Sequence, residues 1–168
     1  MRITAVLAFV IAVSALSAQT PIDPRLQGQL KQVFPDAARF TPKAGSPPHY
    51  TVYNGDTIAG YAFWTTELEP LERGYDGPIK MLVGMDTRGI LTGVLVVENR
   101  EPYGYFSVDT PQFAAQFKGK NIRDAFKVGA DVDAISRASI SVTSASRAIR
   151  NSARRIAREL LTPAGVAK

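Results

Sequence analysis

The stretch "DAISRASIS" at 133–141 carries the side chains of this sequence that are best suited to binding a phosphate. Ser136, Ser139 and Ser141 offer small hydroxyl donors, and Arg137 offers a guanidinium that can make two charged hydrogen bonds to one anion. An expected helix follows, and a helix N-terminus presents unpaired N–H groups and a partial positive charge. The pattern predicts a phosphate seat, although serine-rich helix starts are also typical of plain helix capping.

A row of arginines continues along the same expected helix. Spacings of three, four and four residues place the row on one helix face, which consists of Arg147, Arg150, Arg154 and Arg158. Three interpretations stay open for this basic face: a solvated surface, a contact with an anionic partner surface or membrane headgroups, and a share in binding the phosphate.

Cysteine is absent from the 168 residues, and the sequence contains one histidine. Without cysteine, iron–sulfur clusters, c-type haem and thiol chemistry are excluded. His49 lies in the proline-rich string "GSPPHY" with no candidate nucleophile beside it, so we interpret it as a loop residue and expect no metal site. No catalytic residue stands out, and any chemistry is expected to come from a bound cofactor.

Two β-hairpins are the first elements expected to position these residues. Residues 50–64 contain two β-rich runs around Asn54-Gly55, a pair that favours a tight turn. Residues 79–99 contain a second pair of apolar runs around the turn "DTRG". Four antiparallel strands in one sheet are therefore expected.

Helices are expected on both sides of the hairpins in the chain. The first covers 21–35, with Asp23 as its N-cap before a proline. A second covers 109–120, from the N-cap Thr110 to a stop at Gly119.

The last elements are a short strand at 125–128 and a basic C-terminal helix from about 143 to 161. The apolar stripe of that helix consists of Ile149, Ile156 and Leu160. The order of helices and hairpins predicts an α+β fold, in which an antiparallel sheet built from two hairpins packs with helices.

Residues 1–18 have the features of a secretory signal peptide: Arg2, an apolar run, and then small residues. Cleavage is expected between Leu16 and Gln19, which leaves a single domain over 19–168 without a spanning helix; an uncleaved anchor is the alternative. We therefore expect a periplasmic or otherwise extracytoplasmic protein. The formal net charge is +5, but export makes nucleic acid a poor match for it.

A resemblance to a known family runs through the strings "LKQVFPDAARF", "YTVYNGDTIAGYAFWTTE", "GYDGPIKMLVGMDTRGILTGVLVVENREP" and "FKVGADVDAISRASISV" into the last helix. The sequence resembles the FMN-binding domain at the periplasmic end of NosR/NirI-type respiratory regulators. It is similar, more distantly, to the flavin-carrying subunits of the Rnf and sodium-pumping NADH:quinone reductase complexes. Larger members add membrane helices and iron–sulfur segments; this sequence ends at Lys168, so the flavin domain alone is expected.

In the resembling proteins, a flavin transferase links FMN through a phosphoester to the threonine of a Ser-Gly-Ala-Thr motif. The matching string here is Ser136-Arg137-Ala138-Ser139, so the resemblance implies Ser139 as the hydroxyl that contacts or binds FMN. Serine keeps the hydroxyl that the ester needs. Arginine in place of glycine is the larger departure, because glycine readily adopts positive φ. Arg137 either blocks the transferase or clamps the phosphate of a non-covalent flavin.

The resemblance implies further residues near the flavin. Upstream of the motif, Asp133 takes the place of an acidic residue of the family, and Trp64 is expected in the core. The predicted cofactor-binding set extends beyond the motif to Ile140, Ser141, Gly74, Tyr75, Gly77 and Glu101, with Tyr75 a candidate to stack on the ring.

Two functions from different classes follow from this sequence. The first is an exported FMN-binding electron-transfer flavoprotein, or an accessory to a respiratory redox system, whose partners are redox proteins and a flavin transferase. It would be an electron carrier rather than a turnover enzyme, because no residue is placed as a substrate acid or base. The alternative is a flavin-free binding or assembly module that has lost the attachment motif.

Overall fold

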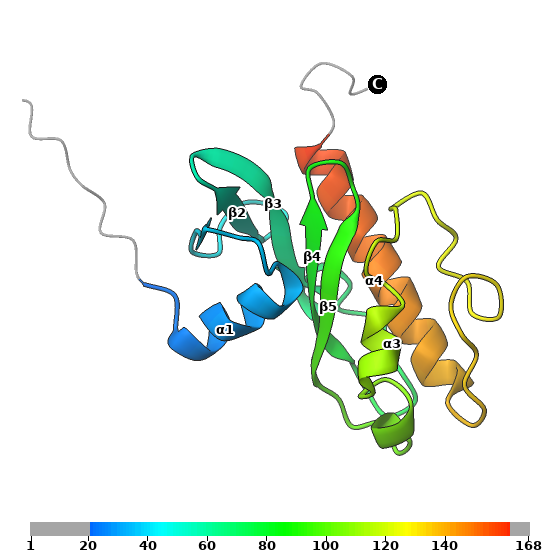
Figure 1. Ribbon diagram of the computed structural model, residues 1–168. Helices are drawn as coiled ribbons and strands as arrows, with labels where there is room; N and C mark the ends of the chain where they lie inside the picture. The colour runs from blue at the N-terminus through cyan, green and yellow to red at the C-terminus, as the bar shows by residue number, and fades with distance from the viewer. Residues whose placement is uncertain (1–20, 162–168) are drawn as a thin grey trace, which may run out of the picture.

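The two predicted hairpins form and join into one antiparallel sheet in the computed structural model, which describes residues 21–161 (Figure 1). The five strands are neighbours in chain order. They are β1 (Arg39–Phe40), β2 (Tyr50–Asn54), β3 (Thr57–Trp64), β4 (Lys80–Asp86) and β5 (Leu91–Glu98). The predicted α+β class is confirmed. The two-residue β1 was not predicted, because it is too short to show an alternating pattern.

The first hairpin turns one residue later than expected. Asn54 pairs with Thr57, so the two-residue loop is Gly55-Asp56 rather than Asn54-Gly55. Gly55 has φ +61 at the first loop position, where a tight hairpin turn requires positive φ.

Helices cover both faces of the sheet (Figure 1). On one face α1 (Pro24–Val33) packs over Trp64 and Leu82. On the other face α3 (Pro111–Ala115) and α4 (Ser139–Leu160) pack over the side chains that alternate with these, such as Phe63. Because β3 and β4 are covered on both faces here, the residues of β3 from Gly60 to Trp64 and of β4 from Met81 to Met85 are continuously buried.

The C-terminal end of α1 approaches the sheet closely enough for backbone contact, in addition to the buried Leu30 side chain. Gly84 and Gly93 are directly paired on β4 and β5, and both lie against Val33 at the end of α1. The hydroxyl of Thr92 donates a 2.6 Å hydrogen bond to the Val33 carbonyl. At the other end, the Asp23 carboxylate accepts from two backbone N–H groups of the first turn, which confirms Asp23 as the N-cap.

Two predicted elements differ from the structure. The helix predicted over 109–120 has the expected cap, Thr110, but α3 ends at Ala115. The following chain instead pairs with the sheet, where Gly119 N–H donates to the Leu91 carbonyl at 2.8 Å. The strand predicted at 125–128 was wrong, because only an isolated bridge joins Val128 to Val132.

Helix α4 begins at Ser139, four residues before the predicted start at 143. Serine-rich sequence has weak helix propensity, but tertiary packing overrides propensity here because Val142 and Ala145 are buried against the sheet. The short helix α2 (Thr65–Leu68) lies between β3 and β4, and η1 (Gly104–Phe106) lies between β5 and α3; neither was predicted.

The predicted leader, 1–18, lies outside the described residues. Within 21–161, no helix has the length and apolar character that a membrane crossing requires. No group of three or more potential metal-ligating acidic, histidine or cysteine side chains gathers within the same range.

Candidate functional site

A tight turn places the predicted phosphate seat at the start of α4. The Ala138 N–H donates to the Ile135 carbonyl at 3.1 Å and closes the turn. Arg137 occupies the third position of this turn with φ +69, a conformation that glycine and asparagine adopt most readily. The arginine therefore keeps the backbone geometry that a glycine at this position would take.

The N-terminus of α4 has no side-chain cap. Its N-cap residue is Ala138, and no side chain of the described residues accepts a capping hydrogen bond from the first turn. Interpretation of the serines as plain caps is therefore wrong for this helix. The N–H groups of the first turn are available to an anion, and Ser139 exposes its side chain beside them.

Glu101 ties the loop that contains Tyr75 to the first turn of α4. Its buried carboxylate accepts hydrogen bonds from the backbone N–H of Tyr75 at 2.9 Å and of Asp76 at 3.0 Å. The Ser141 hydroxyl donates to the same carboxylate from α4. A Cβ added at Gly74 would lie 2.7 Å from the carboxylate carbon, so the approach of the loop requires glycine at this position.

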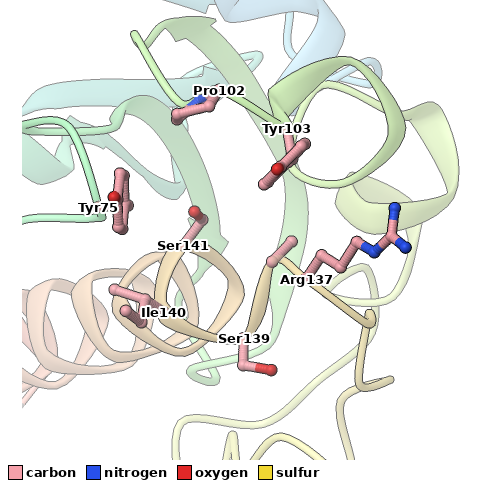
Figure 2. Close-up of a pocket in the computed structure, with 8 residues that line it drawn as sticks. Tyr75, Pro102, Tyr103, Arg137, Ser139, Ile140 and Ser141 are labelled. Carbon is pink, nitrogen blue, oxygen red and sulfur yellow. The ribbon is translucent and has the colours of Figure 1, made fainter.

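A pocket of about 400 Å³ lies between these two segments. It is lined by Tyr75, Pro102, Tyr103, Arg137, Ala138, Ser139, Ile140 and Ser141. Tyr75 and Tyr103 stand on opposite sides of it, with Pro102 between them and α4 below (Figure 2). Tyr75 is 71% exposed and Tyr103 is 44% exposed, so two aromatic rings border a space that is open to solvent.

The polar side chains of the pocket differ in direction. The Arg137 guanidinium points away from the two tyrosines in Figure 2, so in this conformation the alkyl part and backbone line the pocket. Ser139 lies at the lower edge of the pocket in Figure 2, and in this conformation its hydroxyl points away from the two tyrosines, whereas the buried Ser141 hydroxyl donates to Glu101.

The structure brings together most of the predicted cofactor-binding residues. Six line the pocket: Ser139, Arg137, Ala138, Ile140, Ser141 and Tyr75. Glu101 and Gly74 lie behind it and hold its walls. Ser136 and Gly77 do not line it, and Gly77 has φ +119 beside the Arg100 guanidinium. That any of these residues binds a cofactor stays a prediction.

The predicted cofactor-binding set did not include two wall residues, Pro102 and Tyr103. Both directly follow Glu101, a residue of the predicted set, and that position is the signal that could have found them. Trp64 is buried on the α1 side of the sheet, as predicted, and its indole N–H donates to the Tyr50 hydroxyl at 3.2 Å. Asp133 is exposed and does not line the pocket.

Asp131 orders the loop that leads into the turn. Its carboxylate accepts from the backbone N–H of Lys127 at 2.6 Å and of Phe126 at 2.9 Å, and from the Lys120 ammonium at 3.3 Å. Burial opposes the charge, but these hydrogen bonds and the positive charge of Lys120 outweigh it. The pKa of Asp131 is therefore lowered from its ordinary value of 3.8.

The predicted arginine face is only partly a free surface. Arg150 and Arg154 donate to backbone carbonyls of the loop 121–126 at distances between 2.7 and 3.4 Å. Arg147, nearer the pocket, lies 3.7 Å from the Glu72 carboxylate. Arg150 and Arg154 therefore hold this loop against α4. The spacing of the arginines along the helix could not predict these contacts.

Comparison with known proteins agrees with this geometry. Residues 74–154, which contain both walls of the pocket and the predicted seat, match the family described as "FMN-binding domain". Residues 74–154 are therefore similar to this family, whose description implies FMN as the cofactor of its members.

The chain is also distantly homologous to the regulatory protein NosR of Stutzerimonas stutzeri, with 24% identity over 161 residues. The alignment covers 90% of this chain and 22% of NosR, so the chain spans about a fifth of the length of that relative.

Proposed function

We propose that this chain is an exported flavoprotein that holds FMN in the pocket between Tyr75 and Tyr103 and passes electrons to partner proteins of a respiratory system. The main support for the proposal is that three independent features lie at the same place. The seat expected from "DAISRASIS" lines the same pocket as two exposed tyrosines, within the segment that matches the FMN-binding family.

The residues of the pocket fit the parts of FMN. Tyr75 and Tyr103 offer aromatic faces to the flavin ring. The uncapped N-terminus of α4 offers N–H donors and a partial positive charge to the phosphate. A volume of about 400 Å³ lies in the range of pockets that hold small molecules.

Ser139 is the proposed contact for the phosphate, by a phosphoester or by a hydrogen bond. Ser139 is exposed and lines the pocket, and the glycine-like backbone of Arg137 precedes it. A rotation of its side chain would turn the hydroxyl toward the phosphate. If the flavin is not covalently bound, Arg137 would turn toward the pocket and pair its guanidinium with the phosphate.

Bound FMN would supply one- or two-electron transfer, and the chain would supply tethering and orientation. The pocket lining within the described residues contains no carboxylate, histidine or lysine that could act as a substrate acid or base. This composition supports a carrier rather than a turnover enzyme. Export would follow from the leader at 1–18, and covalent attachment would require a flavin transferase as an additional partner.

Intact-mass measurement of the purified protein, before and after denaturation and buffer exchange, tests the attachment. A phosphoester predicts an excess of one FMN less one water, which Ser139→Ala abolishes and Ser136→Ala, on the nearby residue outside the pocket, leaves in place. Non-covalent binding predicts flavin that is released on denaturation. In that case Arg137→Ala weakens affinity by about tenfold to a hundredfold, because charged hydrogen bonds contribute roughly 1.5–3 kcal/mol.

Unchanged flavin content and affinity in both Ser139→Ala and Arg137→Ala would place the seat elsewhere. Absence of FMN binding in the wild-type protein would favour the flavin-free binding or assembly module instead.

A further inference from the structure

A second hollow, of about 510 Å³, lies at the opposite end of α4 from the flavin pocket. Figure 1 shows this end of α4 beside the turn between β4 and β5. Four arginines from three segments line the hollow: Arg88, Arg123, Arg154 and Arg158. The other lining residues are the polar Thr87 and the apolar Ile122, Ala157 and Leu161.

Arg154 is fixed in place at this hollow. Its Nε donates to the Ile122 carbonyl at 2.7 Å and its Nη2 to the Asp124 carbonyl at 2.9 Å. These acceptors are neutral, so the guanidinium keeps its full charge. Since the side chain is already ordered, an anion that binds it incurs little further entropic cost.

The positive charge of the hollow is only partly balanced. Arg88 pairs with Asp86 at 2.7 Å. Arg123 and Arg158 are exposed and form no ion pair within 4.0 Å inside the described range 21–161. The helix dipole favours a cation such as Arg158 in a last helical turn, but it does not account for the arginines from the other two segments.

Ile122, Ala157 and Leu161 add an apolar part to the same hollow. Guanidinium groups suit phosphate oxygens, because they present several N–H donors in a fixed plane. We propose that this hollow is a second anion site, which binds a phosphate group carried on a partly apolar molecule. Free organic phosphates and anionic lipid headgroups share this chemistry.

The hollow is separate from the flavin pocket. Ser139 and Arg158 are nineteen residues apart on one helix, which corresponds to about 28 Å along its axis. The proposal therefore does not depend on flavin binding and can be tested on protein with or without FMN.

Calorimetric titration of the full-length protein with inorganic phosphate and with a monomeric short-chain phosphatidylglycerol tests the site. The double variant Arg123→Gln/Arg158→Gln should bind at least about tenfold more weakly, because each lost contact is a charged hydrogen bond. The matched control is Arg25→Gln/Arg39→Gln, which removes the same charge from two exposed arginines outside both sites and should bind like wild type. Melting temperatures check that both variants are folded.

Vesicle sedimentation separates the two sources of phosphate. A lipid headgroup would be identified if the protein is retained on phosphatidylglycerol vesicles but not on phosphatidylcholine vesicles. This retention should be lost in Arg123→Gln/Arg158→Gln and kept in the control variant. Tighter binding of the monomeric short-chain lipid than of inorganic phosphate, without retention on either kind of vesicle, would identify a free organic phosphate, whereas equal affinity for the two would contradict the apolar part of the site. Equal losses in both double variants, or affinity weaker than about 1 mM for every probe, would overturn the proposal.

Discussion

Arg137 has a side chain but adopts a backbone conformation that glycine adopts more readily. Its φ of +69 is strained for a residue with a Cβ. Arg137→Gly is therefore expected to be more stable to urea unfolding than Arg137→Ala, by about 1 kcal/mol, although both remove the guanidinium. At an ordinary backbone position glycine would instead be less stable, by roughly 0.5–1 kcal/mol. Equal or reversed stabilities would contradict the left-handed conformation.

Asp131 gives the loop before the seat a dependence on acid. Because folding lowers its pKa, the stabilisation is present above the ordinary value of 3.8 and is lost as the pH falls below it, through the folded-state pKa. Asp131→Asn should therefore be less stable than wild type at neutral pH, with the difference shrinking as the pH falls below 3.8. We expect a difference below about 1 kcal/mol, because the carboxylate is partly exposed and screened. Urea titrations at several pH values measure it, and a constant difference would contradict this role.

At the scale of elements, the contact between α1 and the sheet depends on glycine. A Cβ at Gly84 would meet the Thr92 hydroxyl and lie 2.5 Å from the Val33 carbonyl oxygen. Gly84→Ala should force α1 from the sheet and cost about 1–3 kcal/mol in unfolding free energy, as overpacked cores do. The control is Gly28→Ala on the same helix, where nothing lies within 4 Å of the added atom. It should raise stability by up to about 1 kcal/mol, and two similar effects would argue against the close contact.

The sequence predicts the hairpins and the first helix because those signals are local. Alternating runs, a glycine turn, and the cap Asp23 before Pro24 act within a few residues. The start of α4 is different, because its serine-rich first turn is stabilised by burial of Val142 and by the Ser141–Glu101 contact. Such partners lie far apart in the sequence, and helix propensity does not contain them.

The same distinction applies to the site in the whole molecule. Residues 137–141 and Tyr75 could be selected from their types and from the resemblance to a family motif. The supporting role of Glu101 could not, since it depends on a loop and a helix meeting at one carboxylate. The bracing of the loop 121–126 by the arginine row likewise appears only once the chain is folded.

Export of the protein, with cleavage of the predicted signal peptide, can be tested at the N-terminus of the chain. If residues 1–18 are a signal peptide, N-terminal sequencing of protein from the periplasmic fraction should begin between Ser17 and Gln19. An intact Met1 on membrane-bound protein would instead support the uncleaved anchor.

The visible absorption spectrum of the purified protein tests the central claim, FMN binding in the Tyr75–Tyr103 pocket, most directly. Protein isolated from a flavin-producing host, or mixed with FMN and freed of excess, should show flavin absorption in the blue with about one FMN per chain. A spectrum without flavin bands under both conditions, from protein that melts cooperatively, would contradict the claim.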